Sequence, residues 1–249
     1  MQAQANLMFG IHAHQPLGNF EHVFESAYEQ CYRPFLKTLS EHRGIRASLH
    51  FSGCLLEWLE KNQPKYVDLI ARMAGRGQIE LLSGGFYEPI LPIIPPEDAV
   101  GQIQMMNEHI RRRFGQKPRG LWLSERVWEP QLPSLLAEAG LSYTLVDDSH
   151  FVYAGLRHED LFDYYLTEDN GATVAVFPID KKLRYCIPFK LPEDTINHLR
   201  AFPGRGITYG DDAEKFGVWP GTHAWVYGEK YLARLFSQIE ENGDWIAMP

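Results

Sequence analysis

Four short segments concentrate residue types that can do chemistry. They read HAHQP at 12–16, GGFYEP at 84–89, WLSERVWEP at 122–130 and DDAEKFGVWPGT at 211–222. The third segment surrounds one carboxylate, Glu125, with a tryptophan on either side. Surface carboxylates have no need of such neighbours, whereas tryptophans often line sites that stack sugar rings. The four segments therefore predict a site in which acids work beside aromatic walls.

The first segment places His12 and His14 two residues apart, so both point to the same face if they lie on a strand. They could bind a metal, donate hydrogen bonds to substrate hydroxyls, or simply be satisfied histidines at a strand end. A zinc site needs further ligands. His50 and His150 form no recognisable ligand motif with them. We expect neither a metal nor another cofactor in the active site.

The second segment supplies backbone freedom from its glycines, two aromatic rings and the carboxylate of Glu88. The glycines would let a loop fold close to a ligand. The alternative is an ordinary strand-to-loop turn with a solvated glutamate. By itself this segment decides little.

The third segment gives a sharper expectation. If residues 121–125 form a strand, Glu125 ends it, and Trp122 points to the opposite face. We expect the tryptophans to keep water away from Glu125 and to shape a sugar site. The alternative is an ion pair with Arg126 or another cation, because a buried glutamate is usually paired.

The fourth segment packs three acids, Asp211, Asp212 and Glu214, into four positions. Like charges so close cost free energy unless something uses them. An Asx turn before a helix N-terminus would explain one or two of these acids. It does not explain the Lys-Phe-Gly-Val-Trp run that follows.

Two carboxylates on different strands, with aromatic walls and hydroxyl-binding groups, are the equipment of a glycosidase. One carboxylate attacks or stabilises the anomeric carbon, and the other protonates the leaving oxygen. The sequence contains no P-loop, no dinucleotide-binding glycine fingerprint and no G-x-S-x-G elbow.

Strand-like and helix-like segments alternate along the chain, which implies a parallel sheet with right-handed crossovers. The expected strands are 6–14, 45–52, 78–84, 119–125, 142–148, 173–179 and 205–212. Helices are expected over 22–42, 55–62, 64–77, 97–114, 131–140, 188–201 and 228–242. The core-facing positions of the first and last helices are Phe24, Tyr28, Phe35 and Leu39, and Tyr231, Leu232, Leu235, Phe236 and Ile239.

Carboxylates or imidazoles follow five of these seven strands, including His14, Glu88, Glu125, Asp147 and Asp212. Such convergence is natural at the mouth of a parallel barrel, whereas an open sheet gathers only the loops at its switch point. The sequence therefore predicts a single α/β domain built as a seven-stranded barrel.

Composition narrows the class of protein. The 249 residues carry a formal charge of -8, which disfavours nucleic acid or an anionic membrane as a partner. The three cysteines form no CxxC, so neither a disulfide framework nor a cysteine zinc site is indicated. The first ten residues lack the features of a signal peptide, and a cytoplasmic location is expected. The oligomeric state is not readable.

Together, HQP at 14–16, GGFYEP at 84–89, WLSERVWEP at 122–130 and DDAEKFGVWPGT at 211–222 resemble, in order, the first four motifs of glycoside hydrolase family 57, in its 4-α-glucanotransferase and α-amylase-like branch. The resemblance implies an incomplete (β/α)7 TIM-like barrel with parallel strands. It also implies a retaining mechanism on α-1,4-glucans through a covalent glycosyl-enzyme intermediate.

Residue by residue, the resemblance implies that Glu125 is the nucleophile and Asp212 the general acid/base. His14 would contact sugar hydroxyls at the reacting subsite. The further residues expected to bind substrate are His12, Glu80 or Glu88, Trp122, Asp211, Glu214 and Trp219. The expected partner is an α-glucan or maltooligosaccharide.

The sequence departs from the family pattern in two ways. Ala213 stands where a glycine is expected, and the chain carries no counterpart of the family's fifth motif. We expect residues 1–249 to form one catalytic barrel domain without the family's C-terminal helical region and β domain.

Two other interpretations stay open. One is a metal-dependent polysaccharide deacetylase or zinc α-mannosidase-like hydrolase, in which the HAH segment binds metal with Asp147, Asp148 or Asp212. The other is an inactive α-glucan-binding domain. Hydrolysis and transfer share the same intermediate, so the sequence does not separate them.

Overall fold

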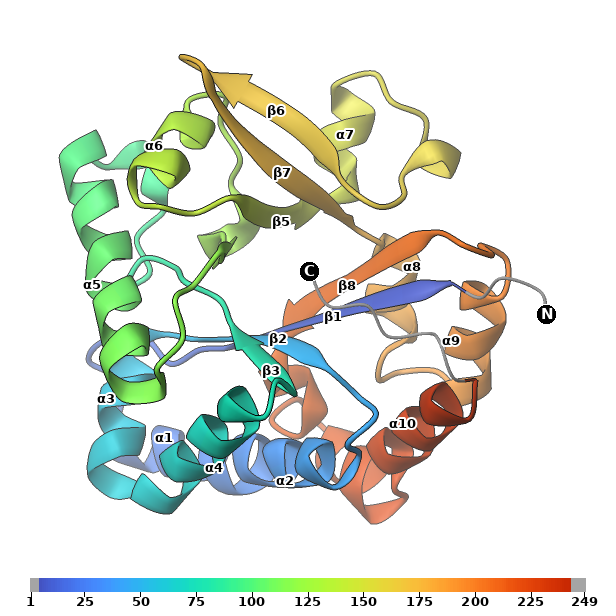
Figure 1. Ribbon diagram of the computed structural model, residues 1–249. Helices are drawn as coiled ribbons and strands as arrows, with labels where there is room; N and C mark the ends of the chain where they lie inside the picture. Colours follow the sequence, from blue (N-terminus) through green and yellow to red (C-terminus); the bar gives the residue numbers. More distant parts are fainter. Residues whose placement is uncertain (1–4, 243–249) are drawn as a thin grey trace.

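The computed structural model describes residues 5–242, and its strands form one eight-stranded sheet (Figure 1). The order is β3-β2-β1-β8-β7-β5-β4, and all pairings along it are parallel. A further strand, β6, pairs antiparallel with β7. The strands are β1 Asn6–Ala13, β2 Ala47–Phe51, β3 Ile79–Leu81, β4 Gly120–Trp122, β5 Tyr143–Asp147, β6 Tyr165–Asp169, β7 Ala172–Ile179 and β8 Gly206–Asp212.

The parallel strands curl into an incomplete barrel, as predicted. Its two ends meet through a single bridge, in which the backbone of Ser83 exchanges hydrogen bonds with Gly120 and Trp122 at 2.9 and 2.8 Å. The β7–β8 pairing is similarly thin and rests on Ile179 and Thr208. Two narrow joints therefore flank the well-paired arc of β1, β2 and β8.

Helices cover the outside of the sheet (Figure 1). They are α1 Glu21–Ala27, α2 Arg33–Glu41, α3 Gly53–Asn62, α4 Pro64–Gly75, α5 Pro96–Phe114, α6 Leu132–Glu138, α7 Asp148–Tyr153, α8 Lys181–Cys186, α9 Pro192–Leu199 and α10 Tyr231–Glu241. A π-helical segment, Tyr28–Tyr32, joins α1 to α2. In the described part of the chain, no helix is both long and apolar enough to cross a membrane.

The helical periodicity located the outer core correctly. All nine core positions predicted for the first and last helices are buried in the largest apolar cluster. The barrel interior is a separate, smaller cluster that includes Trp122, Leu145 and Ile179. Glycine faces these large side chains, because a Cβ on Gly210 would lie 2.9 Å from Ile179.

Several sequence-based boundaries were wrong. The strands predicted at 78–84 and 119–125 contain only three residues each, and β6 and α8 were not foreseen. In particular, β4 ends at Trp122, so Glu125 does not lie on a strand. The first four residues, part of the segment in which no signal peptide was found, lie outside the described range.

Candidate active site

A cavity of about 300 Å³ lies beyond the carboxyl ends of β1, β4 and β8. That is the edge at which parallel barrels gather function. Eight of the ten side chains predicted from the sequence line this cavity: His12, His14, Glu88, Trp122, Glu125, Asp212, Glu214 and Trp219. The convergence expected from polar residues at strand ends is therefore real.

Glu125 reaches the cavity from a strained turn. It forms a short 3-10 turn with Ser124 and Arg126, and both Glu125 and Arg126 have left-handed backbones, with φ of 52° and 54°. Glu88, on another loop of the same cavity, has φ of 55°. A left-handed backbone costs a non-glycine residue on the order of 1 kcal/mol or more and tends to persist at functional sites. The strain brings two acids from different loops into one space.

The tryptophans beside Glu125 have different roles. The ring of Trp122 is buried, lines the cavity and stacks on the His12 imidazole with centroids 4.9 Å apart. Trp128 instead packs against the apolar cluster beneath α5 and α6. Glu125 itself is exposed, so the expectation that its tryptophan neighbours shield it from water is wrong. The reason is the turn, which carries the carboxylate away from the buried strand.

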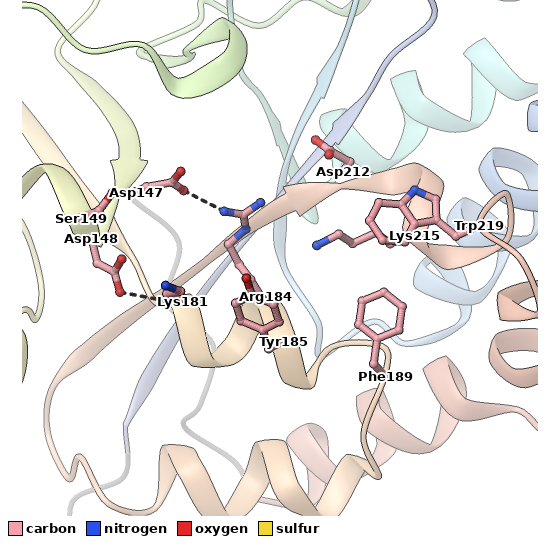
Figure 2. A pocket seen from close by; sticks show the side chains of 10 residues that line it. All are labelled: Asp147, Asp148, Ser149, Lys181, Arg184, Tyr185, Phe189, Asp212, Lys215 and Trp219. Atoms are coloured by element: carbon pink, nitrogen blue, oxygen red, sulfur yellow. Dashed lines mark hydrogen bonds and ion pairs between the residues drawn. The ribbon is translucent and has the colours of Figure 1, made fainter.

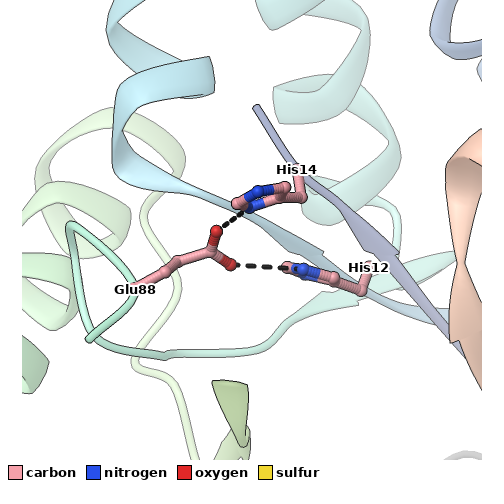
Figure 3. Close-up of side chains that lie close together, drawn as sticks. All are labelled: His12, His14 and Glu88. Carbon is pink, nitrogen blue, oxygen red and sulfur yellow. Dashed lines mark hydrogen bonds and ion pairs between the residues drawn. The ribbon is translucent and has the colours of Figure 1, made fainter. Parts of the chain in front are cut away.

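One side of the cavity is built from imidazoles and acids (Figure 3). Glu88 accepts a short hydrogen bond from Nδ1 of His14, and its other oxygen lies 3.2 Å from Nε2 of His12. Nδ1 of His12 lies 2.8 Å from Nδ1 of His50. Burial, with His50 and His14 nearby, holds the pKa of His12 well below its usual range, so this ring is neutral near pH 7.

Burial opposes charge on His14 as well, but Glu88 outweighs it and the net pKa of His14 is raised. Burial raises the pKa of Glu88, against the pull of His14 and with the help of the carboxylates of Glu125 and Asp212. This pair thus shares a proton between an imidazole and a carboxylate near pH 7.

Glu214 is the third acid on this side. It accepts hydrogen bonds from the Tyr32 hydroxyl and from the backbone N–H of His14, the latter at 3.0 Å. Burial raises its pKa to about 7 despite these donors, and the Asp212 carboxylate adds to the rise. Tyr32 lies far away in the sequence on the π-helical segment, and no sequence signal pointed to it.

Asp212 ends β8, lines the cavity and is the register partner of His12 in the β1–β8 pair. Burial and the neighbouring Asp211 raise its pKa, while Arg126, Lys215 and Arg184 hold the rise back. Nη1 of Arg126 lies 3.9 Å from Asp212. An aspartate in this environment stays protonated to a higher pH than an exposed aspartate does, which suits a general acid.

The remaining two predicted residues do not line the cavity. Asp211 is fully buried and ion-paired with Lys215 and with Arg184, whose Nε lies 3.4 Å away. Its place is therefore beneath the site, where it anchors two cations. Glu80 lies on β3 and accepts a hydrogen bond of 2.7 Å from the Tyr143 hydroxyl. Of the two acids considered in the second segment, Glu88 is the one beside the cavity.

The structure also shows which residues could hold a metal. Among the described residues, the ligand atoms of His12, His14 and Glu88 lie within 4.8 Å of one another. The Glu88 oxygen that lies 3.2 Å from Nε2 of His12 is buried and accepts no hydrogen bond from the described residues. Since Glu88 lines the cavity, a ligand atom or a sugar hydroxyl could satisfy this oxygen. Asp147, Asp148 and Asp212, the acids considered as companions of the HAH segment, are not part of this group.

Comparisons with known proteins identify relatives that are glycosidases or glucanotransferases. The family model of Glycosyl hydrolase family 57 matches residues 8–248. The chain is 53% identical to Alpha-amylase 1 of Dictyoglomus thermophilum over 94% of its length, and 50% identical to 4-alpha-glucanotransferase of Thermococcus litoralis over 95%. It spans 34% and 36% of those relatives, about a third of each.

Two solved structures share the fold of this chain. The crystal structure of the 4-alpha-glucanotransferase from Thermococcus litoralis superimposes with a TM-score of 0.95 at 48% identity, covering 98% of this chain and 39% of that one. A family 57-type branching enzyme from Pyrococcus horikoshii matches 99% of this chain and 69% of its own with a TM-score of 0.77 at 16% identity, which shows the shared fold alone. The chain belongs to glycosyl hydrolase family 57.

Proposed function

We propose that residues 1–249 form one catalytic domain that cleaves α-1,4-glucans with retention of configuration, by hydrolysis or by transfer. The observation that carries the proposal is the meeting of two carboxylates, Glu125 and Asp212, from separate strand ends in one cavity with Trp122 and Trp219. The names of the relatives support the substrate class, since they are an α-amylase and a 4-α-glucanotransferase.

In the first step, the Glu125 carboxylate attacks the anomeric carbon, and the bond from that carbon to the glycosidic oxygen breaks. Asp212 donates its proton to the departing oxygen. Glu125 is exposed and lines the cavity, so a substrate can reach it directly. The raised pKa of Asp212 keeps the proton available for the leaving group.

In the second step, Asp212 accepts a proton from water or from a sugar hydroxyl, whose oxygen attacks the anomeric carbon. The bond to Glu125 breaks and its electron pair returns to the carboxylate. Water gives hydrolysis, and a sugar hydroxyl gives transfer. The chemistry at Glu125 and Asp212 is the same in both cases.

The histidine side of the cavity positions the reacting glucose. His14 carries a proton that it shares with Glu88, so it can donate a hydrogen bond to a sugar hydroxyl. Glu214 lies on the same side and has a pKa of about 7, so it can accept or donate. These groups, together with the Trp122 ring, supply the polar and apolar contacts that sugar rings need.

A location in a reducing compartment such as the cytoplasm is part of the same proposal. Its support is that Cys31, Cys54 and Cys186 are all buried as free thiols.

The test is product analysis with maltoheptaose. The wild-type chain should give shorter products, with longer ones as well if it transfers. Glu125→Gln should lower turnover on the order of 10⁴-fold, because no covalent intermediate can form. Asp212→Asn should cripple maltoheptaose cleavage yet spare the first step on α-glucosyl fluoride, whose leaving group needs no proton.

The matched control is Glu129→Gln, which removes an exposed carboxylate from the same segment and should leave turnover within twofold. Undiminished turnover by Glu125→Gln would refute the assignment. Binding of maltoheptaose without any cleavage by the wild-type chain would instead identify a glucan-binding domain.

A metal-dependent hydrolase is the second candidate, favoured by the cluster of His12, His14 and Glu88 with its undonated Glu88 oxygen. Neutral imidazole and carboxylate are suitable zinc ligands. Under this alternative, added zinc should restore activity to chain treated with a chelator, and His12→Ala should remove both zinc binding and activity. Activity that is indifferent to chelator and zinc would exclude it.

A further inference from the structure

A second cavity, of about 370 Å³, adjoins the first (Figure 2). The two share the side chains of Asp212 and Trp219. Apart from Lys215 of the fourth motif, the rest of the second cavity comes from segments outside the four sequence motifs, chiefly α8 and the loop after it, which contribute Arg184, Tyr185 and Phe189. The acid that the proposed mechanism needs in both steps therefore stands at the junction of two spaces.

The position of that acid assigns a role to each space, on the basis of the proposed function. Glu125 lines the first cavity and not the second, so the sugar that becomes covalently bound occupies the first. Asp212 must contact the oxygen that joins this sugar to the departing one. The departing sugar consequently lies across Asp212 from Glu125, which is the direction of the second cavity.

The walls of the second cavity suit a sugar. Tyr185, Phe189 and Trp219 are 66%, 42% and 44% exposed, which is unusual for three rings around one space. The rings of Phe189 and Trp219 lie 5.8 Å apart, and Nζ of Lys215 lies 5.7 and 5.3 Å from their centroids. These rings are held in place and offer an apolar surface to one side of a pyranose.

Polar groups line the same space. The Arg184 guanidinium donates to Asp147 at 3.0 Å and is also paired with the buried Asp211. Burial alone would lower the pKa of Arg184, but Asp211 and Asp147 outweigh it, so the cation is firmly charged. Fixed donors and acceptors beside an aromatic surface are typical of sites that bind sugar hydroxyls.

We propose that the second cavity binds the glucose unit that leaves and, after it, the sugar acceptor, and that Tyr185 and Phe189 determine how well a sugar competes with water for the glycosyl-enzyme intermediate. A bound acceptor places a hydroxyl oxygen at the anomeric carbon. Its proton passes to Asp212, the new carbon–oxygen bond forms, and the bond to Glu125 breaks with its electrons returning to the carboxylate. Attack by water on the intermediate does not depend on contact with either the Tyr185 or the Phe189 ring.

The test traps the intermediate and follows its release. 5-Fluoro-α-glucosyl fluoride should label Glu125, and mass spectrometry of the intact chain should then follow loss of the label in buffer alone and in buffer with maltose. In the wild type, maltose should accelerate release. In Tyr185→Ala and Phe189→Ala, the ratio of maltose-driven to water-driven release should fall about tenfold, the loss expected for about 1.4 kcal/mol of acceptor binding.

Two further variants make the result specific. Tyr185→Phe keeps the ring and should retain the wild-type ratio. Tyr153→Ala removes an exposed ring of α7 that lies outside both cavities and should leave the ratio unchanged. An unaltered ratio in both Tyr185→Ala and Phe189→Ala would overturn the acceptor role while the labelling itself upholds the proposed function. A chain that is never labelled would overturn both.

Discussion

The active-site cavity has two unlike sides. The histidine side consists of His12, His14, Glu88 and Glu214, where buried acids have imidazole, hydroxyl and backbone N–H groups as hydrogen-bond partners. Burial raises the pKa of Glu88 and that of Glu214, the latter to about 7. On this side burial favours the protonated form of the acids.

The cation side consists of Arg126, which lines the active-site cavity, and of Arg184 and Lys215, which line the adjoining second cavity, with their carboxylate partners. Arg126 and Arg184 both pair with Asp147, at 3.2 and 3.0 Å, and Lys215 pairs with a fully buried aspartate. On this side the acids and bases face each other as ion pairs, which is the usual way for a protein to bury charge.

Acids at one edge of the sheet thus lie in different electrostatic environments and can have different chemical roles. Asp212 lies between the two sides and feels both. Burial and Asp211 raise its pKa, whereas Arg126, Lys215 and Arg184 lower it. The cations thus tune the proposed acid/base, whereas the pKa values of Glu88 and Glu214 on the histidine side are set mainly by burial and by their hydrogen-bond donors.

The largest expected effect tests how strongly burial acts on the acids of the histidine side. The folded-state pKa of Glu214, about 7, lies above its ordinary value of 4.5, so the folded state binds more protons than the unfolded state between those pH values. The wild type should therefore lose stability as pH rises from 4.5 to 7, by about 3 kcal/mol from this residue. Glu214→Gln keeps the shape without the ionisation and should lose that part of the pH dependence.

Urea unfolding from pH 4.5 to 7.5 measures the difference. The free energy of unfolding of Glu214→Gln, relative to that of the wild type, should rise steadily across this range and remain higher above pH 7. Glu129→Gln, which removes an exposed carboxylate, is the matched control for loss of a charge. Parallel curves for wild type and Glu214→Gln would show that Glu214 is ionised without penalty and that the two sides do not differ as described.

A smaller effect tests the tuning by the cation side. Removal of the charge in Arg126→Gln should raise the pKa of Asp212 further, because the guanidinium 3.9 Å from the Asp212 carboxylate no longer favours its charged form. The proton then stays on Asp212 to higher pH. The alkaline fall in maltoheptaose turnover should shift upward accordingly.

The control is Arg111→Gln, which removes an exposed arginine of α5 that pairs with Glu108. Its pH profile should match that of the wild type. A downward shift of the alkaline limb in Arg126→Gln, or none, would mean that Arg126 does not act on Asp212 and that the acid/base is tuned elsewhere.

The sequence predicted most of the histidine side because its members follow strands that alternate with helices. His12 lies on β1, His14 follows the end of that strand and Asp212 ends β8, so simple strand geometry brings them together. The register confirms it, with His12 directly opposite Asp212 in the parallel pair. Periodicity and strand ends can be read from short stretches of sequence, and these local signals are sufficient to predict which residues of the histidine side lie together.

The cation side was not predicted because its geometry is non-local. Arg184 and Tyr185 belong to a six-residue helix without a clear apolar period. The same holds for one contact of the histidine side, where the hydroxyl of Tyr32 reaches Glu214 from a distant helical segment. Arg126 was foreseen only as a partner for Glu125, whereas it pairs with Asp147. The left-handed backbone of Arg126 turns this residue away from the strand. The segment contains no residue type that predicts such a turn.

The smallest expected effect concerns the strain in that turn. Glycine adopts a left-handed backbone without the Cβ clash, so Glu125→Gly should raise the free energy of unfolding by about 1 kcal/mol. The same change should abolish labelling by 5-fluoro-α-glucosyl fluoride, because it removes the proposed nucleophile. A residue kept in a costly conformation, whose removal stabilises the fold and ends activity, is one retained for function.

Lys230 provides the matched control. It is exposed, has φ of 59° and lies at the start of α10, outside the cavity. Lys230→Gly should gain similar stability in urea unfolding while labelling proceeds at the wild-type rate. If Lys230→Gly gains stability and Glu125→Gly loses it, side-chain contacts of Glu125 outweigh the backbone strain, and the turn between the two sides of the cavity is held by its carboxylate. If both gain, the strain is the cost of presenting that carboxylate to the sugar.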